Sequence, residues 1–144
     1  MTPQEYLSQL IDIRKEIKCL DHGRRKLTST ILKGTQFQHD KSYSMEVSRP
    51  NENIVIKLEE FSEELEAKQK ELIELLGTIS KEIEKIPIRN HRLVLTYRYI
   101  YDMDFKDVSE KMNYSHRYTF DIHRNALKEF KKANPDKEWI RLQH

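Results

Sequence analysis

Few side chains in this sequence have the types and spacing that catalysis or metal binding requires. Cys19 and His22 have the spacing of half a zinc site, but no second pair follows at metal-site distance. His116 and His123 lie seven residues apart, too far to share an ion without a third ligand. The acidic run over residues 59–66 is typical of a solvated helix face. Because no nucleophile, base and orienting residue group together and no glycine-rich phosphate loop exists, we expect no metal, no cofactor and no enzymatic activity.

The spacing of residues 105–122 instead matches a helix-turn-helix. Ser109 is small where the two helices would approach most closely, and Asn113 falls in the turn, where a left-handed backbone is often needed. Glycine is commoner at such a position, but Asn tolerates positive φ better than other residues. The small core between the helices is expected to contain Val108, Met112, Tyr114, Thr119 and Ile122.

If this motif forms, the first turns of its second helix face the major groove of duplex DNA. Arg117 can contact a guanine edge through two hydrogen bonds, and Asp121 can accept from cytosine or hold Arg117 in place. Ser115 can cap the helix and direct its terminal amides toward a phosphate. The expected base-reading residues are His116, Arg117, Phe120, Asp121 and Arg124; Ser115, Lys111 and Lys128 are expected at phosphates, and Tyr118 belongs to the same DNA-binding set.

Alternatives remain open for several of these positions. Phe120 can touch a thymine methyl, or it can bury against the N-terminal helices or a partner subunit. His123 is expected to be packed or to face a phosphate. The three short helices could also form a purely structural bundle with ordinary charged faces.

Composition favours an all-α protein, since charged residues make up 35% while Gly is only 3 and Pro only 4. The net charge of +2 divides unevenly near Pro87: residues 1–86 carry 14 Lys+Arg against 16 Asp+Glu, and residues 87–144 carry 12 against 8. A basic C-terminal part suits binding to a polyanion. One cysteine, no signal peptide and no apolar run of membrane length lead us to expect a cytoplasmic protein that does not enter a membrane.

The N-terminal 86 residues carry a heptad pattern on two segments. A capping box at residues 2–5 begins a helix whose apolar seam is interrupted by Arg24, and a second seam resumes at Ile54 with Lys68 as its polar position. Between them, residues 34–53 are expected to be a mobile, poorly ordered connector that allows the helices to pack as a long antiparallel hairpin. Apolar residues beside the seam suggest that this hairpin also packs against another chain as a homo-oligomer. They are Leu7, Ile11, Leu76 and Ile86.

Pro87 is expected to end the second helix and begin a small helix-turn-helix domain over residues 87–132. Asn90, Asp104 and Ser115 are the expected caps of its three helices. The tail, residues 133–144, contains Trp139, Ile140 and Leu142. It is expected either to fold back on its own domain or to dock a partner such as RNA polymerase.

Residues 94–99, 104–112 and 125–127 resemble region four of bacterial sigma factors, which reads the promoter −35 element. More narrowly, residues 112–117 and His123 resemble the phage late-gene transcription activators of the ArpU, RinA and LtrC type. That resemblance implies activation of phage or prophage late operons beside RNA polymerase holoenzyme. Phe120 and Asp121 depart from the basic or aliphatic residues that are common there, so the operator sequence does not carry over.

Two functions follow from these patterns. The first is a sequence-specific regulator of transcription that binds double-stranded DNA. The second is a protein-interaction adaptor that binds RNA polymerase or a sigma factor through the helical hairpin. A nuclease or similar enzyme would require a carboxylate cluster on the DNA-facing surface, where only Asp121 lies.

Overall fold

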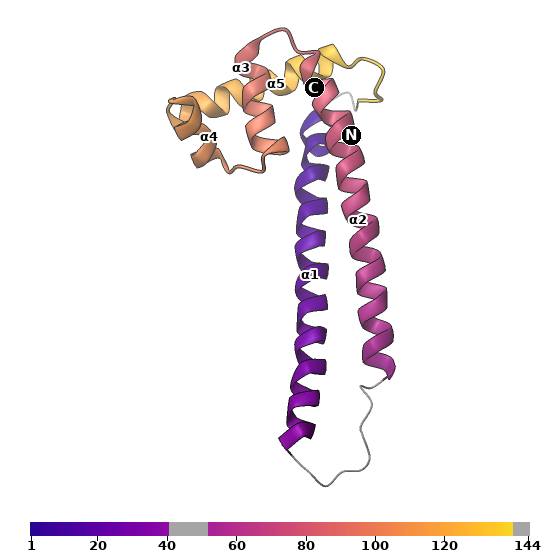
Figure 1. The fold of residues 1–144 in the computed structure, drawn as a ribbon. Coiled ribbons are helices and arrows are strands. Elements are labelled where there is room, and N and C mark those ends of the chain that lie inside the picture. The colour runs from indigo at the N-terminus through magenta and orange to yellow at the C-terminus, as the bar shows by residue number, and fades with distance from the viewer. Residues whose placement is uncertain (41–51, 140–144) are drawn as a thin grey trace. The chain divides into compact units, whose positions relative to one another are not determined.

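The computed structural model describes residues 1–40 and 52–139, and every regular element in these two ranges is helical. The expected all-α class is therefore confirmed. Figure 1 traces the elements in chain order. They are α1 (Pro3–Asp40), α2 (Glu52–Glu84), α3 (Arg89–Leu95), the π-helical turn η1 (Thr96–Ile100), α4 (Phe105–Met112) and α5 (His116–Ala133).

The start of α1 is the capping box that the sequence predicts. The backbone amide of Glu5 donates to Thr2 Oγ1 at 3.2 Å, and the amide of Thr2 donates to Glu5 Oε2 at 3.3 Å. Pro3 occupies the first helical position, where no amide donor is needed. These local contacts fix the residue at which α1 begins.

The expected boundaries of the connector were wrong on the N-terminal side by several residues. The helix α1 continues past Gly34 to Asp40, and α2 begins at Glu52. A single glycine costs a helix only about 1 kcal/mol relative to alanine, too little to end it where neighbouring residues favour helix. The rest of the predicted mobile connector, residues 41–51, lies outside the described residues.

Contacts divide the chain into two compact units. Unit 1 contains residues 1–13 and 72–144, and unit 2 contains residues 14–71. These units do not coincide with a boundary at Pro87, because the first turns of α1 and the last turns of α2 share a core with the C-terminal helices.

The core of unit 1 is built from both ends of the chain. Leu7 and Leu10 of α1 and Ile79 of α2 have no exposed surface, and they cluster with apolar residues of α3, η1, α4 and α5. Leu7 and Ile86 are fully buried and Ile11 and Leu76 are partly buried in this same cluster. The apolar residues that suggested packing against another chain are thus covered by the chain itself, so they no longer argue for an oligomer.

In unit 2, individual residues of α1 and α2 contact each other. Glu16 Oε2 accepts an ion pair from Lys68 Nζ at 2.9 Å, and Phe61 approaches Gly23, where an added Cβ would lie 3.4 Å from the ring. The two polar residues that interrupt the predicted seams both form ion pairs here, Arg24 with Asp21 at 3.0 Å and Lys68 with Glu16 and Glu71.

The prediction that Asn90 caps the helix after Pro87 was wrong. The residue before α3 is Ile88, which is extended at φ −89° and ψ 122° and gives no side-chain cap. The Asn90 amide instead donates to the Tyr114 hydroxyl at 3.2 Å. The helical segment that follows Pro87 also changes form at Thr96, where η1 closes with a bond from the Tyr101 amide to the Thr96 carbonyl at 3.0 Å.

The described part of the tail folds back on unit 1, one of the two outcomes expected from the sequence. Trp139 Nε1 donates to the Asn134 carbonyl at 2.9 Å, and its ring lies 5.8 Å from Tyr6 and 5.9 Å from Phe130. Lys137 lies over the Tyr6 ring and pairs with the buried Glu82. Ile140 and Leu142 lie outside the described residues.

Candidate nucleic-acid interface

The turn between α4 and α5 is set by backbone geometry that its sequence favours. Asn113 has φ 58° and ψ 42°, the left-handed conformation expected from its type. The Tyr114 amide donates to the Ser109 carbonyl at 3.0 Å, and the Asn113 amide to the Glu110 carbonyl at 3.3 Å. This pair of bonds is a Schellman motif, which closes α4 and redirects the chain within two residues.

Side-chain caps begin both helices at the predicted residues. Asp104 Oδ1 accepts from the Asp107 amide at 2.8 Å, and Ser115 Oγ accepts from the Tyr118 amide at 3.1 Å. The Ser115 cap leaves other amides of the first turn of α5 without partners inside the helix, so this end carries partial positive charge.

The inner faces of α4 and α5 hold the two helices together. Val108 and Thr119 have no exposed surface, and Ser109 and Ile122 are 4% and 6% exposed. Met112 and Tyr114 are partly buried against the same cluster. Five predicted core residues and the small Ser109 therefore lie where the spacing placed them.

His123 is packed, not available to a phosphate. Its Nε2 lies 2.8 Å from the Tyr99 hydroxyl, and its ring makes an edge contact with Phe105 at 4.9 Å. Burial, with a smaller contribution from Arg98, lowers the pKa of His123 to about 4. Burial also raises the pKa of Tyr99 to about 12. Both groups are thus uncharged at neutral pH and contribute to packing.

All nine residues of the predicted DNA-binding set are exposed. Positions 117, 121, 124 and 128 recur at steps of four, three and four, so they lie along one side of α5. The whole of α5 contains five Lys and Arg against two acidic residues. This face therefore presents a basic surface beside the capped end of the helix. The nine residues are Lys111, Ser115, His116, Arg117, Tyr118, Phe120, Asp121, Arg124 and Lys128.

Asp121 does not hold Arg117 in place, as one alternative suggested. Its Oδ1 lies 3.8 Å from Arg124 Nη1, and both side chains are more than half exposed. Such an exposed pair contributes little stability and separates readily. Within the described residues, Arg117 has no carboxylate at ion-pair distance, so its guanidinium is free to meet a ligand.

Two aromatic rings stand half exposed on this face. Phe120 is 45% exposed and lies 4.6 Å from Phe105, while Tyr118 is 49% exposed and makes an edge contact with Tyr114 at 4.8 Å. Phe120 therefore rests against Phe105 of α4, with His116 nearby, and keeps part of its ring surface exposed.

One supporting residue was not found from the sequence. Arg98 of η1 donates to the Met103 carbonyl at 2.9 Å, and its guanidinium lies 4.9 Å from the Phe105 ring. It fixes the loop before α4 and supports the ring on which Phe120 rests. No spacing rule marks such a residue, because its position depends on the π-helical turn.

Comparisons with known proteins give a family and no further relative. Among the described residues, no helix is both long and apolar enough to cross a membrane. No curated protein and no solved structure matches the chain. The model of a family described as a protein of unknown function (DUF1492) matches residues 31–131, which are 101 of the 144 residues. The chain belongs to this DUF1492 family.

Proposed function

We propose that the protein is a sequence-specific, double-stranded DNA-binding regulator of transcription in which α4, its turn and α5 form a helix-turn-helix. The observation that carries the proposal is the Schellman turn at Asn113 followed at once by the Ser115 cap. Together they bury one side of α5 and leave its first turns exposed with a basic, partly aromatic surface. A helix with this exposure fits the major groove of B-form DNA.

The chemistry of each group suggests its part in binding. Arg117, free of any ion pair among the described residues, can reach guanine O6 and N7 together. The exposed part of the Phe120 ring suits a thymine methyl, and Lys111 and Lys128 suit phosphates on either side of the groove. This arrangement involves binding alone, with no catalytic step.

The N-terminal helices could join two copies of the proposed helix-turn-helix. The opposed segments of α1 and α2 are proposed to form the helical hairpin, which would bring two copies onto one site and raise their combined affinity. In unit 2, Leu32 and Ile56 are 57% and 51% exposed, apolar surface that a second copy would cover. A homo-oligomer formed through this unit is part of the proposal.

The biological setting rests on resemblance. The similarity of residues 112–117 and His123 to phage late-gene activators supports an activator of phage or prophage late genes in the bacterial host cytoplasm. Such an activator would work beside RNA polymerase holoenzyme, because the resemblance to sigma factors is to region four.

A binding-site selection on random double-stranded DNA, followed by titration at two salt concentrations, tests the proposal. The wild-type protein should select one sequence and show a steep salt dependence. Arg117→Ala should relax the preference at one base pair by about 1–3 kcal/mol, whereas Lys128→Ala should weaken all sequences equally and reduce the salt slope by about 1.

Arg25→Ala is the matched control, since Arg25 is an exposed arginine of unit 2 paired with Asp21. It should bind DNA as the wild type does. Equal binding of Arg117→Ala and wild type to every sequence would remove Arg117 from the readout.

The exposed apolar residues of unit 2 also favour a second candidate, an adaptor that binds RNA polymerase or a sigma factor through the helical pair. This function predicts no selected sequence and no steep salt slope in the same experiment. Leu32→Ser would then abolish polymerase binding while leaving any DNA affinity unchanged.

A further inference from the structure

A second basic region lies at the other end of α5. A pocket of about 750 Å³ opens between the last turns of α5 and the loop that follows it. Its size falls within the range of roughly 300–1,000 Å³ that small-molecule sites occupy. The lining residues are Lys128, Lys131, Lys132, Pro135, Lys137, Glu138 and Trp139, and we call this the lysine pocket.

The charges of the lysine pocket are strongly unbalanced, with four lysines against one glutamate. Lys137 is already engaged, because it pairs with Glu82 at 3.1 Å and lies 4.3 Å from the Tyr6 ring. Lys132 is 3.6 Å from Glu129, a weak surface pair. Among the described residues, neither Lys128 nor Lys131 has a carboxylate at ion-pair distance, so at least two ammonium groups are free for an anion.

The aromatic wall of the lysine pocket is held in place before any ligand arrives. Trp139 Nε1 donates to the carbonyl of Asn134, a residue only 3% exposed. The Asn134 amide in turn donates to the carbonyls of Glu82 and Phe130. Edge contacts with Tyr6 and Phe130 fix the indole further. The ring therefore does not have to be ordered on binding, which lowers the cost of forming a complex.

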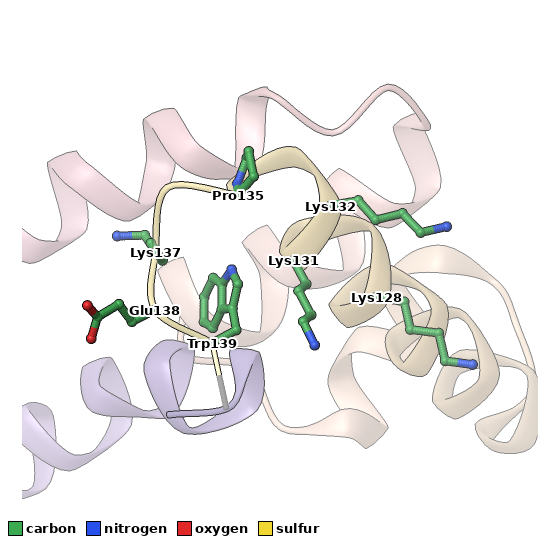
Figure 2. A pocket seen from close by; sticks show the side chains of 7 residues that line it. All are labelled: Lys128, Lys131, Lys132, Pro135, Lys137, Glu138 and Trp139. Atoms are coloured by element: carbon green, nitrogen blue, oxygen red, sulfur yellow. The ribbon is translucent and has the colours of Figure 1, made fainter. Parts of the chain in front are cut away.

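Figure 2 shows how the two kinds of group are placed. The Trp139 ring and the Lys131 side chain lie beside each other, one from the loop and one from α5. Lys128 and Lys132 extend from α5 with their ammonium groups directed away from the indole, and Lys137 and Glu138 lie on the opposite side of it. A ligand that reaches both walls must carry negative charge toward α5 and a flat apolar group toward the indole.

We propose that the lysine pocket binds a free nucleoside triphosphate, with its base against Trp139 and its phosphates on Lys128 and Lys131. Ammonium groups bind phosphates as compact point charges, and bases stack on aromatic rings whatever their sequence. Inorganic phosphate would leave the apolar wall uncovered, and an aliphatic acidic peptide offers no flat ring for the indole.

The lysine pocket goes beyond the proposed DNA-binding function and shares only Lys128 with the DNA-binding set. Arg117 and Lys131 are 14 residues apart on α5, about 21 Å along the helix axis. The pocket also includes Pro135 and Trp139 of the loop, which the DNA-binding set does not use. Loss of one activity can thus be measured apart from the other.

The protein contains a single tryptophan, so emission excited at its absorption edge reports on this pocket alone. The full chain should be titrated separately with ATP, GTP, inorganic tripolyphosphate, a hexaglutamate peptide and a single-stranded decanucleotide. Both nucleotides should give a saturable change in emission. Their affinity should exceed that of tripolyphosphate by about tenfold or more, because only they supply a base to stack.

Three variants sharpen the result. Lys131→Glu and Lys128→Glu should each weaken nucleotide binding by about tenfold, since each replaces a charge-assisted contact with repulsion. Glu138→Gln should strengthen it slightly by removing the one acidic side chain of the lining. Lys70→Glu, an exposed lysine in unit 2, is the matched control and should bind nucleotide unchanged.

Circular dichroism at neutral pH should show all variants folded, and Lys131→Gln serves if Lys131→Glu does not fold. The proposal is overturned if neither nucleotide saturates, or if tripolyphosphate or hexaglutamate binds as tightly as ATP. Tighter binding of the decanucleotide than of ATP and GTP would overturn it too, by showing a site for a nucleic acid strand. If Lys131→Glu loses nucleotide binding but keeps its DNA selectivity, the lysine pocket and the DNA-binding surface are separate sites.

Discussion

The same heptad spacing produces two different environments in units 1 and 2. In unit 1, Leu7, Leu10 and Ile79 have no exposed surface. In unit 2, Leu65, at 6% exposure, is the one residue classed as buried among those whose side chains are described. Both units contain segments of α1 and α2, so helix type and spacing do not explain the difference.

The difference lies in what covers the apolar stripe. Two helices that face each other bury only the seam between them, whereas α3, α5 and the tail add further layers in unit 1. The polar seam residues Arg24 and Lys68 both fall in unit 2, where water can reach them. A polar residue in a heptad seam thus marks the part of a helical pair that lacks other cover.

Truncating one leucine to alanine in each unit should give the largest difference in the free energy of unfolding. Leu10→Ala in unit 1 should lower the free energy of unfolding by about 2–5 kcal/mol, because it leaves a cavity in a closed core. Leu58→Ala, at a partly exposed position of unit 2, should cost about 1 kcal/mol. Urea denaturation followed by circular dichroism measures both. Equal losses would show that unit 2 is as well covered as unit 1.

Acid should affect unit 1 through His123. The unfolded chain binds a proton at this histidine near pH 6.5, whereas the folded protein binds it only near pH 4. Stability from this group is therefore complete above about pH 6.5 and falls as the pH is lowered through 4, by about 3 kcal/mol in all.

Urea midpoints at pH 7, 5.5 and 4.5 measure this effect. His123→Gln should remove that part of the pH dependence, while His22→Gln, at an exposed position of unit 2, should keep it. A wild type and His123→Gln variant with parallel pH profiles would contradict the assignment.

Removing one ion pair in each unit should give the smallest difference in the free energy of unfolding. Lys137→Ala would leave Glu82, which is 6% exposed, with the Tyr6 hydroxyl at 2.6 Å as its remaining side-chain partner. The cost should be about 1–3 kcal/mol, the range for a buried polar group that loses its partner. Lys68→Ala breaks an exposed pair in unit 2, and its unfolding curve should overlay that of the wild type. A loss for Lys68→Ala matching that of Lys137→Ala would mean that solvent does not separate the two pairs.

Features decided by neighbouring residues could be predicted from the sequence. The caps at Thr2, Asp104 and Ser115 depend on amides within three residues, and the left-handed Asn113 depends on its own side chain. The exposure of the predicted DNA-binding set follows from the same local periodicity, because the sequence correctly predicts the buried side of α5.

Features that depend on contacts with distant segments could not be predicted from the sequence. The sequence predicts Leu7 and Ile86 at an oligomer surface because no local pattern shows that the C-terminal helices cover them. It predicts Asn90 as a cap because nothing near this residue reveals the Tyr114 hydroxyl, 24 residues later. Lys131 and Trp139 meet across a loop whose course depends on Glu82, and no spacing rule joins them.

The contacts of Tyr6 with Phe130 and Trp139 also bear on how the chain folds as it is made. Tyr6 precedes Phe130 by 124 residues and Trp139 by 133 residues. The first turns of α1 therefore leave the ribosome on the order of ten seconds before the residues that cover them. The facing segments of unit 2 are closer in sequence and are complete earlier. Leu7 and Leu10 therefore stay open to solvent or to chaperones until α5 and the loop after it have been made, and unit 1 closes after unit 2.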